Sequence, residues 1–235
     1  MKDLRVFSGN ALKIMAMVTM FIDHLGYILF PKVTILRVIG RLSLPIFAFM
    51  IAEGCIYTRS KLRYFLSVFI LAVICQFGYI AAGLGGKLSI LVTFSYSLLI
   101  IFSLQHLRKM LTNGTVRDIV FAYLLSVFAV GATFILTRYY RVDYGFWGCM
   151  LPVFAYFAVF VNEKATINFK VATFAVGVAI LSYKYKGIQP YSLLALPLIL
   201  MYSGKRGMAD IKYMFYAFYP LHLFILYVIK FLFYK

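Results

Sequence analysis

Apolar runs long enough to cross a lipid bilayer recur along the whole of this chain. A membrane-spanning helix needs about 20 consecutive, mostly apolar residues. Of the 235 residues, 64% are hydrophobic and 13% are charged, and the mean hydropathy is +0.92. Soluble domains are about half apolar and a quarter charged, so this chain has more apolar residues than one water-surrounded core can bury. The sequence therefore predicts an all-α, integral membrane protein with several spans in one bundle.

About nine segments meet this rule of length and composition, and short polar connections separate them. No connection is long enough for a separate soluble domain, so we expect residues 1–235 to form a single transmembrane domain. The expected spans cover residues 11–30, 35–57, 63–83, 88–106, 117–137, 145–161, 168–184, 189–203 and 213–233.

The chain is strongly basic, with a net charge of +17. In a soluble protein such an excess would suggest a nucleic-acid partner. Here most basic residues lie between apolar runs, where cytoplasmic loops collect positive charge and meet anionic lipid headgroups. We therefore expect these basic residues to contact membrane lipids and expect no nucleic-acid partner. The distribution of Lys and Arg over alternate span ends favours a cytoplasmic N-terminus.

The cysteines predict neither a disulfide nor a metal site. Cys55, Cys75 and Cys149 are odd in number and none belongs to a CxxC pair. Buried, unreactive thiols are the expected state of such residues, and we expect no bound metal.

The first expected span contains three ionisable residues, Lys13, Asp23 and His24. Ionisable groups in a hydrocarbon layer are costly, and they mark functional sites or face a packed interior. Adjacent helix residues point about 100° apart, so Asp23 and His24 each need a polar partner of their own. Because this arrangement suits helix-to-helix attachment poorly, we interpret His24 as the centre of an active site.

The second expected span supplies partners for these charges. If the two helices form a hairpin that turns near residues 32–33, Asp23 lies one residue from the level of Arg41, and Lys13 lies next to the level of Glu53. Buried charges must be paired, so we expect ion pairs between Asp23 and Arg41 and between Lys13 and Glu53. Arg37 lies one turn before Arg41 on the same helix face. Beyond these residues, Pro45 is expected to kink the helix.

Several segments together resemble the TraX family, which is named for the membrane protein that acetylates the N-terminus of F-type conjugative pilin. The resemblance rests on LKIMAMVTMFIDHLG, LRVIGRLSLPIFAFMIAEG, VDYGFWG, QPYSLLALPLILMYSGKRG and KYMFYAFYPLHLFILYVI, in this order. The first span is also similar to that of the wider transmembrane acyltransferases, in which ten residues separate a basic residue from a histidine. Lys13 and His24 keep this spacing, with Lys where Arg is usual. Leu44, Ser203 and the KLSILVTF segment depart from the family pattern.

The resemblance implies a multi-pass protein of the bacterial inner membrane that transfers an acetyl group from cytoplasmic acetyl-CoA. The acceptor would be an amine or hydroxyl, on a pilin-like peptide, a glycan or a lipid. Lys13 and Glu53 are the expected cofactor-binding residues of the first two spans. Lys13 and His24 are about 16 Å apart along a helix, which is similar to the reach of a pantetheine arm. His24 is the candidate general base, with Asp23 or another carboxylate orienting its ring; covalent acetyl-histidine catalysis is the alternative. Arg37 and Arg41 would stabilise the oxyanion or bind the acceptor.

Four further residues are candidates for the site, each with a structural alternative. His222 in the last span is either a second proton-transfer or binding group or a hydrogen-bonded core histidine. Lys205 and Arg206, between glycines, either grip the CoA phosphates or belong to an ordinary basic loop. Asp143 either meets the acceptor or is an acidic residue that begins a helix.

A small ion- or proton-coupled transporter is the competing prediction for function. Asp, Glu and His residues inside spans also mark ion pathways. Many transporters contain internal repeats and paired broken helices, and the sequence shows neither feature. We therefore favour the acetyltransferase.

Overall fold

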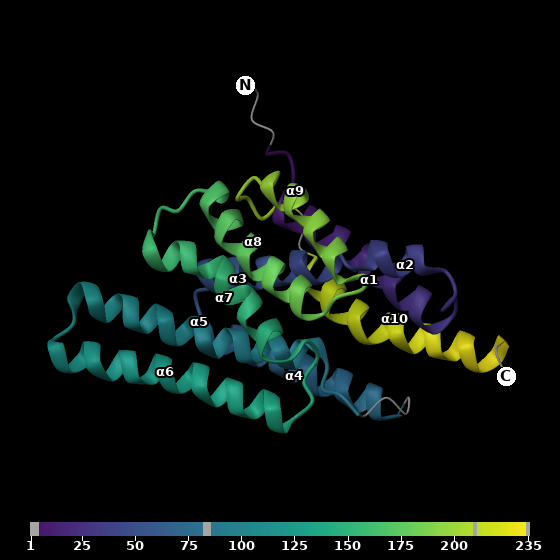
Figure 1. The fold of residues 1–235 in the computed structure, drawn as a ribbon, viewed down its shortest axis with the longest axis horizontal. Coiled ribbons are helices and arrows are strands. Elements are labelled where there is room, and N and C mark those ends of the chain that lie inside the picture. The colour runs from purple at the N-terminus through teal and green to yellow at the C-terminus, as the bar shows by residue number, and fades with distance from the viewer. Residues whose placement is uncertain (1–4, 82–85, 209–210, 234–235) are drawn as a thin grey trace. The chain divides into compact units, whose positions relative to one another are not determined.

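The computed structural model describes residues 5–81, 86–208 and 211–233, and these ranges contain helices and no strand. Of these described residues, 80% are helical. Along the chain, the elements are α1 (Gly9–Ile28), α2 (Thr34–Gly40), α3 (Ser43–Tyr57), α4 (Lys61–Ala81), α5 (Ile90–Asn113), α6 (Val116–Tyr139), α7 (Gly145–Val161), α8 (Ile167–Lys184), the 3₁₀ helix η1 (Gln189–Leu194), α9 (Ala195–Leu200) and α10 (Lys212–Phe233) (Figure 1).

The helices confirm the predicted all-α membrane fold. Among the described residues, seven stretches are long and apolar enough to cross a membrane, with α2 and α3 counted as one. The α7 helix has 17 residues, and η1 and α9 have six residues each, so these two apolar segments are shorter. The predicted number of nine is reached only when they are included. Pro190 and Pro197 lack the N–H that a continuous α-helix needs, which explains the short, irregular η1–α9 segment.

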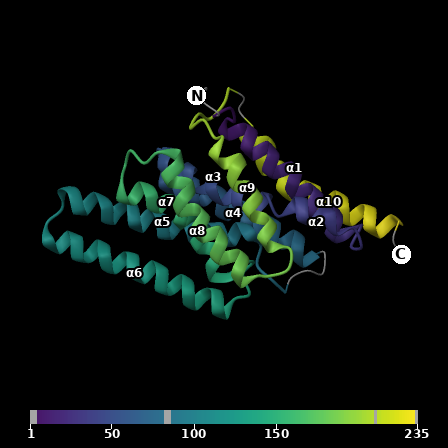
Figure 2. The ribbon, with the colours of Figure 1, turned by 45° about the horizontal axis from the view of Figure 1, so that its top comes forward.

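The helices form two compact units. The first comprises Met1–Met50 with Val178–Lys235, and the second comprises Ile51–Gly177. In the first unit α1 packs beside α2 and α10, as Figures 1 and 2 show, and η1 contacts α2. In the second unit α5 packs against α4, α6 and α7. That the whole chain acts as a single transmembrane domain stays a prediction.

The predicted kink in the second span takes the form of a break between α2 and α3. Pro45 has no N–H to donate to the carbonyl of Arg41, four residues earlier, and its ring crowds that carbonyl. The α2 helix therefore ends at Gly40, whose carbonyl accepts a hydrogen bond from Ser43 Oγ at 2.8 Å. Arg41 consequently lies at the junction of two helices.

Two glycines allow α1 and α2 to approach closely. A Cβ atom on Gly26 would lie 2.7 Å from Cβ of Leu36, and one on Gly40 would overlap the side chain of Asp23. Small residues at such contacts let two membrane helices pack backbone to backbone. This close packing brings the charged residues of the two helices together.

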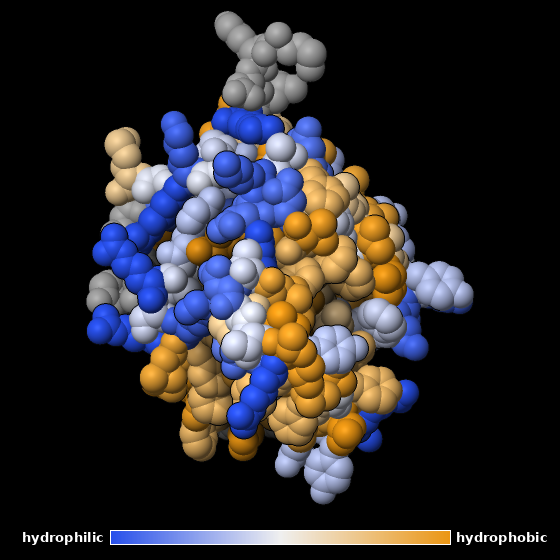
Figure 3. Space-filling view, turned by 90° about the vertical axis from the view of Figure 1, so that its left-hand side faces the viewer, coloured by the Kyte–Doolittle hydropathy of each residue, from blue (hydrophilic) through white to orange (hydrophobic). Residues whose placement is uncertain are grey.

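The surface is largely apolar, as expected of helices that face lipid. In α6 only Ala122, Ser126 and Thr133 are buried, whereas large side chains such as Phe121 and Phe128 are exposed. Figure 3 shows one face of the molecule, on which polar side chains gather in one area and apolar side chains cover much of the rest. Such exposed apolar surface is stable against lipid tails and unstable in water.

A buried ion pair joins α3 to α8 within the second unit. Lys170 Nζ lies 2.6 Å from Glu53 Oε1, and Glu53 is 3% exposed. The predicted pairing of Glu53 with Lys13 is therefore wrong. A hairpin relates the depths of two consecutive spans only, whereas the observed partner comes from a helix much later in the chain.

We expect Lys170→Met to lower the free energy of unfolding by about 3–5 kcal/mol, because the Glu53 carboxylate would be buried without a counter-ion. Thermal unfolding of the purified protein in detergent measures this change. The control is Glu53→Met/Lys170→Met, which removes both charges and should unfold close to the parent. If this double variant is as unstable as Lys170→Met, the ion pair is not the source of the stability.

Candidate active site

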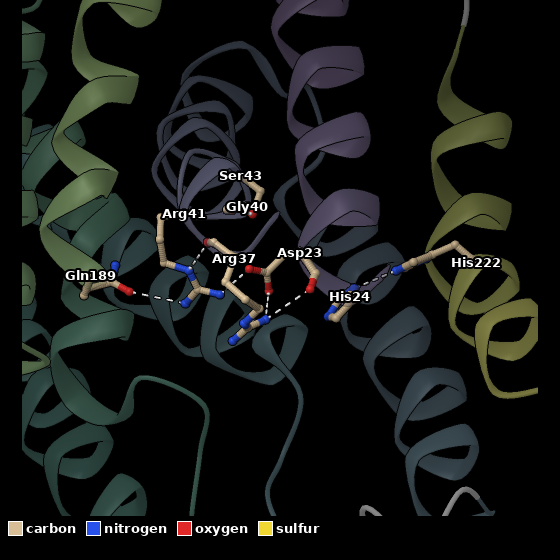
Figure 4. A network of polar contacts seen from close by, with 8 residues as sticks. All are labelled: Asp23, His24, Arg37, Gly40, Arg41, Ser43, Gln189 and His222. Atoms are coloured by element: carbon tan, nitrogen blue, oxygen red, sulfur yellow. Dashed lines mark hydrogen bonds and ion pairs between the residues drawn. The ribbon is translucent and has the colours of Figure 1, made fainter. Parts of the chain in front are cut away.

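The centre of the polar cluster in the first unit is the carboxylate of Asp23 on α1. Its Oδ2 atom lies 2.5 Å from Nη1 of Arg37, and its Oδ1 atom forms an ion pair with Nη2 of Arg41 (Figure 4). Arg37 Nη1 also lies 3.2 Å from the backbone carbonyl of Asp23. The predicted pair between Asp23 and Arg41 is confirmed, and Arg37 joins it.

The sequence of α2 explains how one carboxylate meets two guanidinium groups. Arg37 and Arg41 are four residues apart, so they lie on the same side of the helix, one turn apart. Arg41 Nε donates to the Arg37 carbonyl at 3.2 Å, which ties the second arginine to the first turn. Arg37 also packs over the ring of Tyr27, at 5.1 Å from its centroid. These contacts hold both side chains toward α1.

The imidazole ring of His24 is hydrogen bonded to a second histidine. Nδ1 of His24 lies 2.9 Å from Nε2 of His222, which comes from α10. His222 is 3% exposed, and its Nδ1 atom lies 2.8 Å from the Phe218 carbonyl. Figure 4 shows the two rings facing each other, on the far side of Asp23 from Arg41. The structure thus brings together two of the predicted site residues that are 198 positions apart.

The expectation that Asp23 orients the His24 ring is wrong. Both carboxylate oxygens of Asp23 are bound by guanidinium groups, and Nδ1 of His24 is bound by His222. Adjacent residues on a helix point about 100° apart, so the two side chains reach different neighbours. The orienting group on the His24 ring is therefore another imidazole.

The predicted cofactor-binding residues of the first unit lie at the opposite end of α1 from His24. Lys13 is eleven residues before His24, or about three turns, so the two lie on one face of the helix. The loop with Lys205 and Arg206 is attached to the start of α1, because the carbonyls of these two residues accept the Gly9 and Asn10 N–H groups at 2.8 and 2.9 Å. The basic side chains of this loop are exposed.

The remaining two candidates lie in the second unit. Asp143 precedes α7, where its backbone carbonyl accepts a hydrogen bond from Thr93 Oγ1 at 2.7 Å. Glu53 pairs with Lys170. Roles for Asp143 and Glu53 in binding acceptor or cofactor stay predictions.

Gln189, at the start of η1, is a site residue that was not predicted from the sequence. Its Oε1 atom accepts a hydrogen bond from Arg41 Nη1 at 3.4 Å (Figure 4). Its side chain is buried, and its Nε2 atom has no partner among the described residues. A polar amide before Pro190, at the start of an apolar segment, was the available signal. The buried N–H donor beside Arg41 suits an oxygen atom of a ligand.

Among the described residues, no group of three or more His, Cys, Asp and Glu side chains could hold a metal ion. Cys55, Cys75 and Cys149 are buried free thiols. The residues of the polar cluster are suited to proton transfer at the histidines and to anion or oxyanion binding at the arginines.

Comparison with known proteins adds independent information. The family model described as TraX protein matches residues 8–230. A probable fimbrial assembly protein FimC, serogroup H1, of Dichelobacter nodosus is 25% identical over 92% of this chain and 93% of its own length. An uncharacterized protein of Rickettsia prowazekii is 41% identical over 54 residues, so the chain spans only 21% of that relative. No solved structure matches the chain.

We expect Gly40→Ala to destabilise the site by about 1–3 kcal/mol, because the added methyl group would overlap Asp23 and separate α1 from α2. The matched control is Gly131→Ala in α6, where a Cβ atom meets nothing within 4 Å. That control should be neutral or slightly stabilising, since alanine favours helix. Thermal unfolding in detergent compares the two, and equal midpoints would contradict the close packing at Gly40.

Proposed function

Because this chain belongs to the TraX family, we propose that it is a membrane-embedded acetyltransferase that uses acetyl-CoA. The observation that carries the proposal is the hydrogen bond between the partly buried His24 and the buried His222, beside an arginine-bound carboxylate and within a bundle of apolar helices. Histidine is the side chain best suited to take up and release protons near neutral pH. A membrane protein in pilus biology fits both the family and the fimbrial assembly relative.

In the proposed reaction, His24 acts as the general base. Its ring takes a proton from the acceptor amine or hydroxyl as that nucleophile attacks the thioester carbonyl. The tetrahedral intermediate collapses, the C–S bond breaks, and the CoA thiolate takes the proton back from the imidazolium. The acceptor is left as an amide or an ester, and free CoA leaves as a thiol.

The arginine cluster supplies the positive potential for this reaction. Two guanidinium groups share one carboxylate, so the group Arg37, Arg41 and Asp23 carries a net positive charge. Developing negative charge on the thioester oxygen, or an anionic group of the acceptor, is stabilised beside such a group in a low-dielectric site. The buried Nε2 donor of Gln189 lies next to Arg41 and adds a directed N–H for the same oxygen.

Acetyl-CoA would enter from the basic end of α1. Lys13, Lys205 and Arg206 offer positive charge to the CoA phosphates, and Lys13 lies about 16 Å from His24 along the helix axis. The pantetheine arm would then follow the α1 face that carries both residues. In this arrangement the basic end is cytoplasmic, and the protein lies in the bacterial inner membrane.

A pilin-like N-terminal amine is the acceptor that we favour. The relative from Dichelobacter nodosus is named as a probable fimbrial assembly protein, and its match covers nearly the whole chain. An amine at the end of a peptide that is itself embedded in the membrane could reach a base that is partly buried among helices. Glycan hydroxyls and lipid headgroups are the acceptors to be compared with it.

We expect His24→Ala to reduce acetyl transfer from labelled acetyl-CoA by about 100-fold or more, which is the usual contribution of a general base. The assay follows CoA release by purified protein in nanodiscs, with and without a pilin-like peptide. His106→Ala is the control, because it removes a histidine in the other unit. If the parent binds no acetyl-CoA and instead conducts ions in liposomes, the protein is a carrier and the proposal fails.

We expect Lys205→Ala/Arg206→Ala to raise the KM for acetyl-CoA about tenfold with little change in kcat. The loop should stay in place, because two of its backbone carbonyls accept hydrogen bonds from the first N–H groups of α1. A tenfold change corresponds to about 1.4 kcal/mol of lost phosphate binding. Lys184→Ala/Lys186→Ala removes the same charge elsewhere in the unit. An equal effect of both double variants would argue against a specific phosphate site.

A further inference from the structure

The hydrogen bonds of the histidine pair determine which nitrogen atoms carry protons. Nδ1 of His222 lies 2.8 Å from the Phe218 carbonyl, and Nε2 of the same ring lies 2.9 Å from Nδ1 of His24. A carbonyl oxygen can only accept, so Nδ1 of His222 must be the donor. In a neutral imidazole one nitrogen donates and the other accepts, so Nε2 of His222 is an acceptor.

The same reasoning fixes the proton on His24. Since Nε2 of His222 accepts, the hydrogen bond between the rings requires a proton on Nδ1 of His24. Nε2 of His24 then has a lone pair and no proton. This nitrogen is the only one of the four that can take up a proton without breaking a hydrogen bond of the pair.

The structure holds the His222 ring in one orientation. Phe218 stacks on it, with ring centroids 4.8 Å apart and an interplanar angle of 8°, and Tyr219 meets it edge-on with centroids 5.8 Å apart. A ring held on both nitrogens and between aromatic neighbours cannot turn over to exchange its donor and its acceptor. The neighbours of His222 thus keep its Nδ1 as a donor and its Nε2 as an acceptor toward His24.

We propose that His222 is a positioning residue that keeps His24 as the Nδ1–H tautomer, with Nε2 as the basic atom. The role rests on the proposed general-base function of His24. The hydrogen bond on one imidazole nitrogen sets the protonation of the other, and in hydrolase triads a carboxylate does this. Here the orienting group is a neutral imidazole, which adds no further charge to an apolar interior, where ions are costly.

The tautomer can be observed directly because the chain has three histidines. In the His106→Gln variant, ¹⁵N-histidine labelling leaves signals from His24 and His222 alone. At a pH where the rings are neutral, both should be protonated at Nδ1, although free histidine prefers the proton on Nε2. A His24 ring protonated at Nε2 in this spectrum overturns the proposal, whatever the enzymatic activity.

Two substitutions separate positioning from packing. In His222→Gln the amide oxygen can take the place of Nε2 as acceptor, so His24 should keep its proton on Nδ1. In His222→Leu the acceptor is lost, and the His24 proton should move to Nε2. Retention of the Nδ1–H tautomer in a folded His222→Leu variant overturns the proposal. If that variant does not fold, the ¹⁵N spectra of the His106→Gln protein and of His222→Gln still test the proposed tautomer.

The kinetics should follow the tautomer. We expect His222→Leu to lower kcat for acetyl transfer at least tenfold with an unchanged KM for acetyl-CoA, and His222→Gln to recover most of this loss. A His222→Gln variant that keeps the tautomer but is as slow as His222→Leu contradicts a positioning role. If the spectra are as expected and no variant or parent transfers acetyl groups, the tautomer assignment stands and the proposed function fails.

Discussion

The carboxylate of Asp23 lies buried on the first helix, with a guanidinium group bound to each of its oxygens. None of these three charges would be stable alone among apolar helices, since an unpaired ion costs several kcal/mol in such surroundings. The helix hairpin and its close glycine contacts bring α1 and α2 together, and the break before Pro45 places Arg41 at the end of α2. All three features allow the charges to pair. With the charges matched, His24 can occupy the adjacent position without facing an uncompensated carboxylate.

The sequence predicted most of the architecture because its signals are local. Each apolar run became helix, since length and hydropathy alone decide whether a segment suits a bilayer. The pairing of Asp23 with Arg41 was also predictable, because a short hairpin sets the relative depths of two consecutive helices. The partner of Glu53 was not, because Lys170 comes from a helix 117 residues later, and its depth cannot be derived from that hairpin.

The hydrogen bond between His24 and His222 could not be predicted from the sequence. His24 and His222 were each candidates for the site, but nothing in the sequence indicated that they form a pair. That α10 packs beside α1 is a tertiary fact with no signature in residue spacing. Gln189 was not predicted for the same reason, because its role depends on the hydrogen bond from Arg41. A sequence shows the type of each residue, but only the structure shows which residues from distant segments are in contact.

The contribution of α10 to the histidine pair has a consequence for biosynthesis. Helices enter the membrane in chain order, so the first helix is inserted long before the last has been translated. Until α10 reaches its place beside α1, the His24 ring has no neighbour to fix its proton. Under the proposed function, nascent chains and prematurely terminated products should therefore transfer acetyl groups more slowly than the protein in which α10 lies beside α1.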